Sequence, residues 1–200
     1  CWFALALLVA LAAGCGALRD LAAPTSSQLP AEWKALLDDL RALERQIGFR
    51  ETSNFAHLTD ERETYTYCGW APKSVLPYSY EDPAIRWLES ADASQCHDAD
   101  DGNDWYFGQI EVLGEIETPI TPAMLAGDFD RFAYLVLHED CHDQFELPYG
   151  IEEPLCDIIA HRAMARFAAQ KYAWHAPQNR ALRNYTRVQS RQSRVTVARY

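Results

Sequence analysis

The segment YLVLHEDCHDQFELPYGIEEPLCDIIAH, residues 134–161, constrains the fold of this chain more than any other stretch. His138 and His142 follow an apolar run at a spacing of four, which places them on one face of a helix. The residues LPYG at 147–150 indicate a turn, and a second helix is expected from about residue 152 to 172. The histidines and acidic residues of this segment are therefore expected on two consecutive helices joined by a turn.

The residues His138, Glu139 and His142 form an H-E-x-x-H pattern. Both imidazoles can reach one metal ion, and Glu139 projects about 100° around the helix from His138. Zinc lowers the pKa of a bound water to roughly 7, and a neighbouring carboxylate can take the proton as that water attacks a polarised carbonyl. The pattern therefore predicts a Zn2+ site with Glu139 as the catalytic base.

The helix after the turn offers the remaining site groups. A catalytic zinc needs a third protein ligand and an open position, and its histidines bind a carboxylate through the other ring nitrogen. Glu153 and Asp157 share a face at a spacing of four, so we expect Glu153 to be the ligand and Asp157 to support a histidine. Glu152 is the alternative ligand. Tyr149 and His161 are both candidates for stabilising the transition state, and the sequence does not choose between them.

HEDCH followed by E-x-x-x-D on the next helix resembles the gluzincins, the thermolysin-like clan of zinc metallopeptidases. The resemblance implies that His138, His142 and Glu153 bind zinc, that Glu139 is the base and that Asp157 supports a histidine. It also implies a zincin-like fold, in which an edge strand pairs with the extended peptide substrate.

Within this clan the chain most resembles a family of bacterial lipoproteins labelled aminopeptidases. That family shares the short turn before the glutamate helix and an upstream L-G segment with a following proline, comparable to VLGEIETPITPAML at 112–125. The strand that would pair with substrate is then Gln109–Glu115. No G-x-M-E-N segment is present, so aminopeptidase specificity follows from the resemblance alone. A metzincin site is excluded because its third histidine would fall at Pro148.

The N-terminal run WFALALLVALAAGCG is typical of the apolar region of a signal peptide and is short for a membrane span. No initiator Met or basic region precedes it, so we expect the sequence to begin inside a signal at 1–14. Its ending LAAGC resembles a bacterial lipoprotein box, which implies lipidation of Cys15. An ordinary secretory signal or a short anchor is the alternative. Residues 15–29 would form a tether, and the protein would face the periplasm from the cell envelope or be secreted.

Four cysteines follow this region, and an exported protein lies in an oxidising compartment. The most local pairing joins Cys68 to Cys96 and Cys141 to Cys156, and small buried thiols are the alternative interpretation. Cys141 and Cys156 each lie three residues from a proposed ligand. A disulfide between them would clamp the two helices that carry the site.

Periodicity and composition predict one helix-dominated α+β domain over residues 30–175, with a small edge-strand sheet. The other expected elements are a helix over 30–49, a strand at 64–70, a strand pair or one bent strand at 105–117, and a helix from 121 to about 145 interrupted near Gly127. Residues 176–200 form a basic tail, and the sequence leaves open whether it folds onto the domain.

Charge is unevenly distributed along the chain, whose net charge is −11. Nine Arg and Lys and no Asp or Glu follow Asp157. For an exported protein a lipid surface is a better partner of this segment than nucleic acid, and a solvated helix face is the simpler interpretation. The expected function is zinc-dependent hydrolysis of a peptide or protein substrate by a membrane-tethered enzyme. The alternative is a non-catalytic envelope lipoprotein that uses the scaffold for binding or structure.

Overall fold

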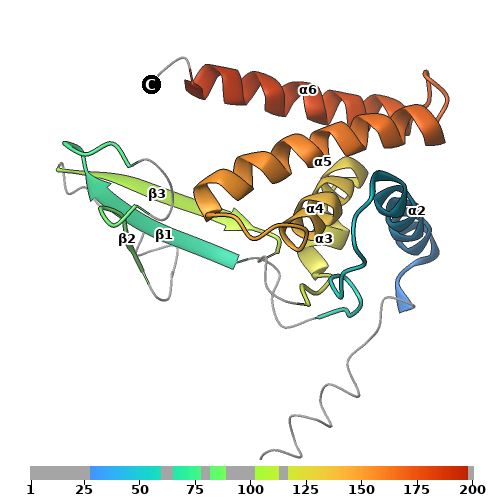
Figure 1. Ribbon diagram of the computed structural model, residues 1–200, viewed down its shortest axis with the longest axis horizontal. Helices are drawn as coiled ribbons and strands as arrows, with labels where there is room; N and C mark the ends of the chain where they lie inside the picture. The colour runs from blue at the N-terminus through green and yellow to red at the C-terminus, as the bar shows by residue number, and fades with distance from the viewer. Residues whose placement is uncertain (1–27, 60–64, 78–81, 89–101, 113–116, 198–200) are drawn as a thin grey trace, which may run out of the picture.

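The computed structural model describes residues 28–59, 65–77, 82–88, 102–112 and 117–197. Within these residues, helices and a small antiparallel sheet give the helix-dominated α+β architecture that the sequence predicts. The elements are α2 (Ala31–Ile47), β1 (Tyr65–Pro72), β2 (Arg86–Trp87), β3 (Asn103–Ile110), α3 (Pro122–Ala126), α4 (Phe129–His142), α5 (Tyr149–Lys171) and α6 (Pro177–Val197). In Figure 1 the helices pack together and the sheet projects from one side of them.

The helix α2 is amphipathic and ends at a glycine. Its buried side chains include Leu36, Leu37, Leu40 and Leu43. Gly48 adopts a φ of 92°, and its N–H and that of Phe49 donate hydrogen bonds to carbonyl groups of the last helical turn. A left-handed residue at this position favours glycine and closes the helix. The bounds of α2 agree with the helix expected over 30–49.

Two helices occupy the region in which one interrupted helix is expected. The Thr121 hydroxyl caps α3 by accepting a hydrogen bond from the Met124 N–H at 3.2 Å, and Pro122 fills the first helical position. Gly127 ends α3 in an extended conformation, and α4 begins at Phe129. The break at Gly127 therefore separates a short helix from the longer one that carries both histidines.

The helix α5 begins earlier than the sequence predicts. The backbone of Pro148 is extended, and its carbonyl accepts a hydrogen bond from the N–H of Glu152 at 3.0 Å. The helix consequently starts at Tyr149, so the expected turn at 147–150 is shorter. Pro154 lies in the second helical turn. Because α5 starts at Tyr149, both Glu152 and Glu153 lie in regular helix.

The sheet is a three-stranded antiparallel ribbon of order β2-β1-β3. The strands β1 and β3 each contain eight residues and pair along their whole length, whereas β2 is two residues long and was not expected. β1 corresponds to the strand expected at 64–70. The region 105–117 contributes the single strand β3 at one edge of the described sheet, and residues 113–116 lie outside the described part of the chain.

Two glycines allow aromatic rings to lie directly on the sheet. A Cβ atom at Gly108 would lie 2.3 Å from Cζ of Tyr67, and one at Gly69 would lie 2.6 Å from Cε3 of Trp87. Any larger residue at either position would displace a ring. The sheet therefore covers part of its own surface with aromatic side chains, while the main hydrophobic core is formed mostly by the helices.

The basic C-terminal segment folds as α6 and packs onto the other helices. Leu182 is fully buried, and Asn179 is 2% exposed. Nδ2 of Asn179 donates hydrogen bonds to the carbonyl oxygens of Ala168 at 2.9 Å and Tyr172 at 3.1 Å. α6 contacts both α4 and α5, and Figure 1 shows it as the layer at the upper edge of the molecule. The segment whose order the sequence left open is thus helical as far as residue 197.

A disulfide joins Cys141 on α4 to Cys156 on α5, with their Cα atoms 5.5 Å apart. Cys68 is also disulfide-bonded, but Cys96 lies outside the described residues, so the Cys68–Cys96 pairing stays a prediction. The expected signal and the lipidation residue Cys15 likewise lie outside them. None of the described helices is long and apolar enough to cross a membrane.

Candidate metal centre

Three side chains from α4 and α5 converge on one point. Nε2 of His138 lies 3.2 Å from Nε2 of His142. Glu153 faces both rings, with Oε2 3.2 Å from Nε2 of His138 and Oε1 3.3 Å from Nε2 of His142. One ligand atom from each residue can be chosen so that all lie within 4.8 Å of one another. The structure thus brings together the two histidines and the glutamate that the sequence indicates.

The other ring nitrogen of each histidine faces a carboxylate. Nδ1 of His138 lies 3.4 Å from Oδ1 of Asp157, which is the supporting contact expected from the sequence. Nδ1 of His142 lies 2.8 Å from Oε1 of Glu152. The second oxygen of Glu152 accepts a hydrogen bond from the Leu147 N–H at 3.0 Å. Both imidazoles are therefore oriented with Nε2 directed to the common point.

Tyr134 also contacts the site, although the sequence motif does not indicate it. Its hydroxyl donates a hydrogen bond to Oδ1 of Asp157 at 2.5 Å and lies 3.1 Å from Nδ1 of His138. Burial and the negative charge of Asp157 raise the pKa of this hydroxyl well above its usual range, so it remains protonated. The sequence spacing could have indicated this contact, because Tyr134 precedes His138 by one helical turn on the same face of α4.

Arg131 connects the site to two distant parts of the chain. Its guanidinium donates to both carboxylate oxygens of Glu111, at 3.0 and 2.7 Å, just after β3 ends. The same group donates to the Tyr185 hydroxyl on α6 at 2.9 Å and lies 5.2 Å from the ring centroid of Tyr134. Arg131 thus holds the end of β3 and the middle of α6 beside the helix that carries the histidines.

Asp140 lies between the two histidines in sequence but on the opposite face of α4. Its side chain is fully buried and forms an ion pair with Arg41 of α2. Its Oδ1 accepts hydrogen bonds from the Thr52 hydroxyl at 2.5 Å and from Nδ2 of Asn54 at 3.1 Å. A buried carboxylate needs such partners to offset its desolvation. These contacts brace α4 from behind, against α2 and the segment that follows it.

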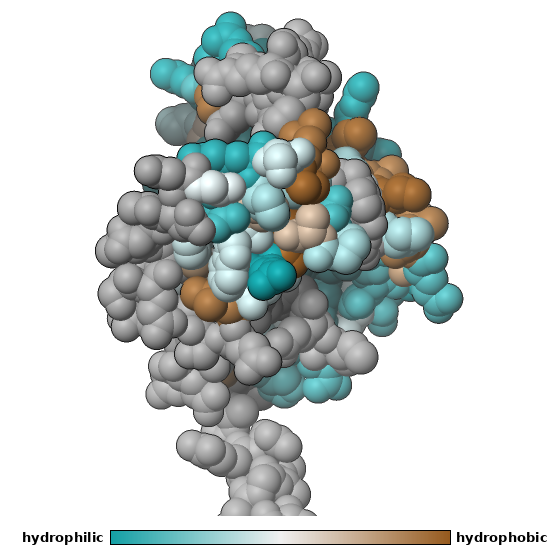
Figure 2. All heavy atoms as spheres, turned by 90° about the vertical axis from the view of Figure 1, so that its left-hand side faces the viewer, coloured by the Kyte–Doolittle hydropathy of each residue, from teal (hydrophilic) through white to brown (hydrophobic). Residues whose placement is uncertain are grey.

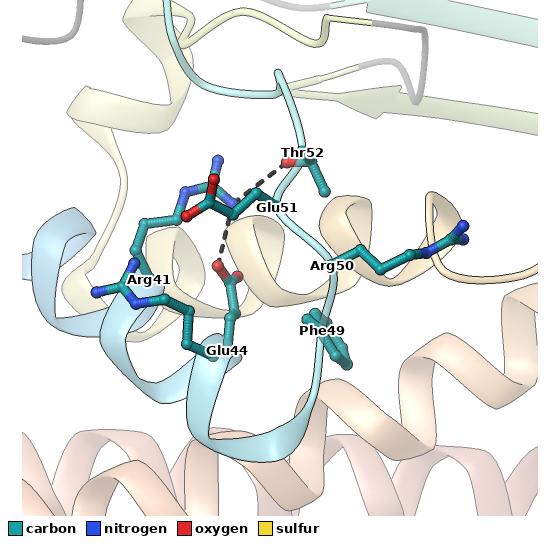
Figure 3. Close-up of a pocket in the computed structure, with 7 residues that line it drawn as sticks. Arg41, Glu44, Phe49, Arg50, Glu51 and Thr52 are labelled. Carbon is teal, nitrogen blue, oxygen red and sulfur yellow. Dashed lines mark hydrogen bonds and ion pairs between the residues drawn. The ribbon is translucent and has the colours of Figure 1, made fainter.

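Glu44 shares Arg41 with Asp140. Figure 3 shows Arg41 turned toward Glu44 and Thr52 in a pocket of about 220 Å³, and the Arg41–Glu44 contact is 3.0 Å long. Oε1 of Glu44 is buried and has no hydrogen-bond partner among the described residues. Burial and the nearby Asp140 carboxylate raise the pKa of Glu44 to about 9, although Arg41 opposes this effect. Glu44 is therefore a buried, protonated acid at neutral pH.

His138 is protonated at neutral pH. Burial disfavours the charged form of His138, but hydrogen bonds to Asp157 and Glu153 outweigh this effect and raise its pKa to about 9. The pKa of His142 is also raised against burial, by Glu153 and Glu152. The protonated His138 ring faces the Glu153 carboxylate at the point where a cation would lie. A metal ion would therefore displace the His138 proton when it binds.

Glu139 is 8% exposed and lies near His138, His142 and Glu153. Burial raises the pKa of its carboxyl to about 7, while the charges of His138 and His142 act in the opposite direction. A general base works best when its pKa lies near the working pH. The surroundings of Glu139 thus suit a group that gains and loses a proton near neutrality.

The two candidates for transition-state stabilisation occupy different parts of α5. His161 stacks on the Tyr134 ring with centroids 5.5 Å apart, and its Nε2 is buried without a hydrogen-bond partner among the described residues. Burial lowers the pKa of His161, which keeps the ring neutral. Tyr149 begins α5, but its side chain is not among those described. His161 therefore packs against Tyr134, the residue that contacts His138 and Asp157.

Access to the centre is greater on the α5 side than on the α4 side. The side chain of His138 is 7% exposed, whereas those of Glu153 and Asp157 are 30% and 47% exposed. Figure 2 views the end of the molecule that carries the sheet, where hydrophobic and hydrophilic side chains lie next to one another. The Cys141–Cys156 disulfide fixes α4 and α5 together three residues from His138 and from Glu153. The candidate ligands thus lie on a helix pair joined by a disulfide, with one side open to solvent.

Comparisons with known proteins find no matching family model, no matching curated protein and no matching solved structure. Any functional conclusion therefore depends on the chemistry of the residues themselves. Two imidazoles and a carboxylate, each imidazole backed by a second carboxylate, are a donor set suited to a divalent metal such as zinc.

Proposed function

We propose that this protein hydrolyses peptide bonds with zinc held by His138, His142 and Glu153 and with Glu139 as the general base. The observation that carries the proposal is the convergence of three ligand atoms within 4.8 Å. Two histidines and one glutamate are the ligand set of thermolysin-type catalytic zinc. Carboxylates on the second nitrogen of both rings further support it, because zinc-bound histidines usually donate that N–H to such a partner.

The open ligand set favours a catalytic over a structural role. Structural zinc is normally closed by four protein ligands, whereas catalytic zinc keeps one position for water or substrate. The group found among the described residues has three members, and Glu153 is partly exposed. The non-catalytic alternative also gives no reason for Glu139, a buried carboxyl beside both histidines.

The chain's own residues have separable tasks in the proposed reaction. When bound, zinc would polarise the scissile carbonyl and lower the pKa of a water molecule toward neutrality. Glu139 would accept the proton of the attacking water and deliver it to the leaving amine. Asp157 and Tyr134 would keep the His138 ring in one orientation, and Glu152 would do the same for His142.

We further propose a zincin-like arrangement in which an extended peptide lies along β3. This strand lies at one edge of the described sheet, and Gln109 within it is exposed. Glu111 follows the strand directly and pairs with Arg131 on α4, which brings the strand end beside the histidine helix. Strand pairing gives affinity through main-chain hydrogen bonds and is independent of the peptide's side chains.

An exported location in the bacterial envelope, with lipid at Cys15, forms part of the proposal. The disulfide between Cys141 and Cys156 supports it, because disulfides persist in oxidising compartments such as the periplasm. Mass spectrometry of the mature N-terminus would test the lipid attachment.

The first experiment is a measurement of metal content by mass spectrometry on the purified protein and on Glu153→Gln. We expect close to one zinc per native chain and a strong reduction in the variant. A peptide library would then be incubated with the native protein and with Glu139→Gln. We expect the variant to keep its zinc and to lose activity by about 10²- to 10⁴-fold, the usual range for loss of a general base.

Two results would reject the proposal in different ways. A native protein that binds no zinc even after metal addition has no such centre. A zinc-loaded protein that cleaves no peptide, and whose stability and metal content are unaffected by Glu139→Gln, would instead be the non-catalytic lipoprotein.

A further inference from the structure

Among the described side chains of α6, four exposed arginines form a line on its outer face, Arg180, Arg183, Arg187 and Arg191. Their spacing of three or four residues places them on one side of the helix, which we call the arginine face. The opposite side of α6 holds the buried Leu182 and the half-buried Tyr185, which pack toward α4 and α5. The arginine face is therefore directed away from α4 and α5, against which α6 packs as the upper layer in Figure 1.

The arginine face has no acidic partner among the described residues. Arg180 donates to the backbone carbonyl of His175 at 3.5 Å, and Arg187 donates to the side-chain oxygen of Asn184 at 3.1 Å. The guanidinium of Arg183 lies 3.4 Å from the centroid of the Trp174 ring. None of these contacts neutralises charge. Within the part of the chain that the structure describes, these positive charges are thus left unpaired, in a protein whose net charge is −11.

An exposed aromatic residue lies beside this positive surface. Trp174, in the loop between α5 and α6, is 74% exposed, and Val188 on the flank of α6 is 52% exposed. Trp174 and the first three arginines of the face also line a surface depression of about 430 Å³. Tryptophan combines an apolar ring with a polar N–H, which suits the boundary between water and lipid.

We propose that the arginine face and Trp174 dock this protein on the surface of an anionic phospholipid bilayer. Arginine binds phosphate groups through several N–H donors, and a row of them on one helix can contact headgroups while the helix lies parallel to the membrane. Trp174 and Val188 would enter the interfacial region beside them. A nucleic acid would satisfy the arginines but would leave Val188 in water, so the bilayer fits this surface better.

The test is contact between Trp174 and lipid, measured on the full chain. Vesicles of phosphatidylcholine, with or without 30% phosphatidylglycerol, would carry brominated acyl chains that quench tryptophan fluorescence. The signal of Trp174 is obtained as the difference between the native protein and Trp174→Phe. This readout reports how α6 meets the bilayer and does not depend on how the N-terminus is attached.

We expect Trp174 to be quenched on the anionic vesicles in 20 mM salt and to recover in 500 mM salt. Replacing the four arginines of the face by Gln should abolish the quenching, since each basic residue near an anionic surface contributes about fivefold to partitioning. The matched control carries four changes elsewhere, Arg45→Gln, Arg86→Gln, Arg162→Gln and Arg166→Gln. All four control residues are exposed, and none has a described ion pair, so this variant should behave as the native protein does.

Three outcomes would overturn the proposal. Trp174 that stays unquenched on anionic vesicles does not meet the bilayer. Equal quenching on neutral vesicles, or equal loss in both four-residue variants, would remove any role for the arginine face itself. A 20-base-pair DNA duplex that abolishes the quenching at a lower phosphate concentration than the lipid would identify nucleic acid as the preferred partner. Circular dichroism of each variant would show that α6 is still folded.

Discussion

Oε1 of Glu152 lies 2.8 Å from Nδ1 of His142, while Nε2 of the same ring faces Glu153 at 3.3 Å. Two adjacent glutamates therefore contact two different nitrogens of one imidazole. The sequence offered them as competing ligands, but the geometry gives them different positions, with Glu153 at the common point and Glu152 behind the ring.

This difference predicts unequal losses of zinc. Glu152→Ala should weaken zinc binding by about 10- to 100-fold, which is typical for loss of a group that orients a ligand. Glu153→Ala removes a ligand and should weaken it considerably more. Competition with a chromophoric chelator measures both affinities. If Glu152→Ala proved the more damaging change, the two glutamates would have to exchange roles.

Zinc affinity should depend strongly on pH. In the metal-free protein, hydrogen bonds to Asp157 and Glu153 raise the pKa of His138 to about 9, so at pH 7 zinc must displace its proton. The apparent affinity should therefore rise with pH up to about 9 and fall as the pH is lowered. Titration calorimetry in two buffers of different ionisation enthalpy would count the released protons. A release of no proton at pH 7 would contradict the protonated state of His138.

Tyr134→Phe should weaken the support of His138 without removing any ligand. The variant loses the hydrogen bond to Asp157 and the contact with Nδ1 of His138. Both of these polar atoms then lack one of their partners. We expect a cost of about 1–3 kcal/mol in the free energy of unfolding and a measurable loss of zinc affinity. Urea denaturation and chelator competition provide the two measurements. Tyr185→Phe is the control, because the described hydrogen bond of the Tyr185 hydroxyl is to Arg131 and not to His138 or Asp157.

Stability should fall as the pH rises through the neutral range because of Glu44. Burial and Asp140 raise its pKa in the folded chain from 4.5 to about 9, so the folded state holds a proton that the unfolded state releases. The unfolding free energy should decrease between about pH 5 and pH 9, by up to about 1.4 kcal/mol per pH unit. Glu44→Gln should flatten this slope and raise stability at pH 8. Urea denaturation of both proteins at pH 5.5 and pH 8 tests this expectation, and identical slopes would contradict it.

Much of the centre could be predicted because its groups are close in sequence. His138 with His142, and Glu153 with Asp157, are separated by one helical turn, and helix geometry alone puts each pair on one face. The break at Gly127 follows from equally local rules. The predicted start of α5, at about residue 152, was wrong by a few residues. The helix begins directly after Pro148, where a longer turn was expected.

The parts that the sequence could not supply depend on distant contacts. Arg41 and Asp140 are 99 residues apart, and Tyr185 reaches Arg131 across 54 residues. No periodicity links such pairs, since only the packing of α2 and α6 brings them together. Tyr134 was missed for another reason, because an apolar run before a metal motif favours interpreting an aromatic residue as part of the core.

The helix pair that contains the disulfide also bears on the order in which the protein assembles. All three proposed ligands and the Cys141–Cys156 bridge lie within residues 138–156, so closing this hairpin costs little chain entropy. Contacts of short sequence separation form early in folding. The contact between Arg41 and Asp140 spans 99 residues, so we expect it to form later. We therefore expect the candidate centre to take its local shape first and α2 to pack against it afterwards.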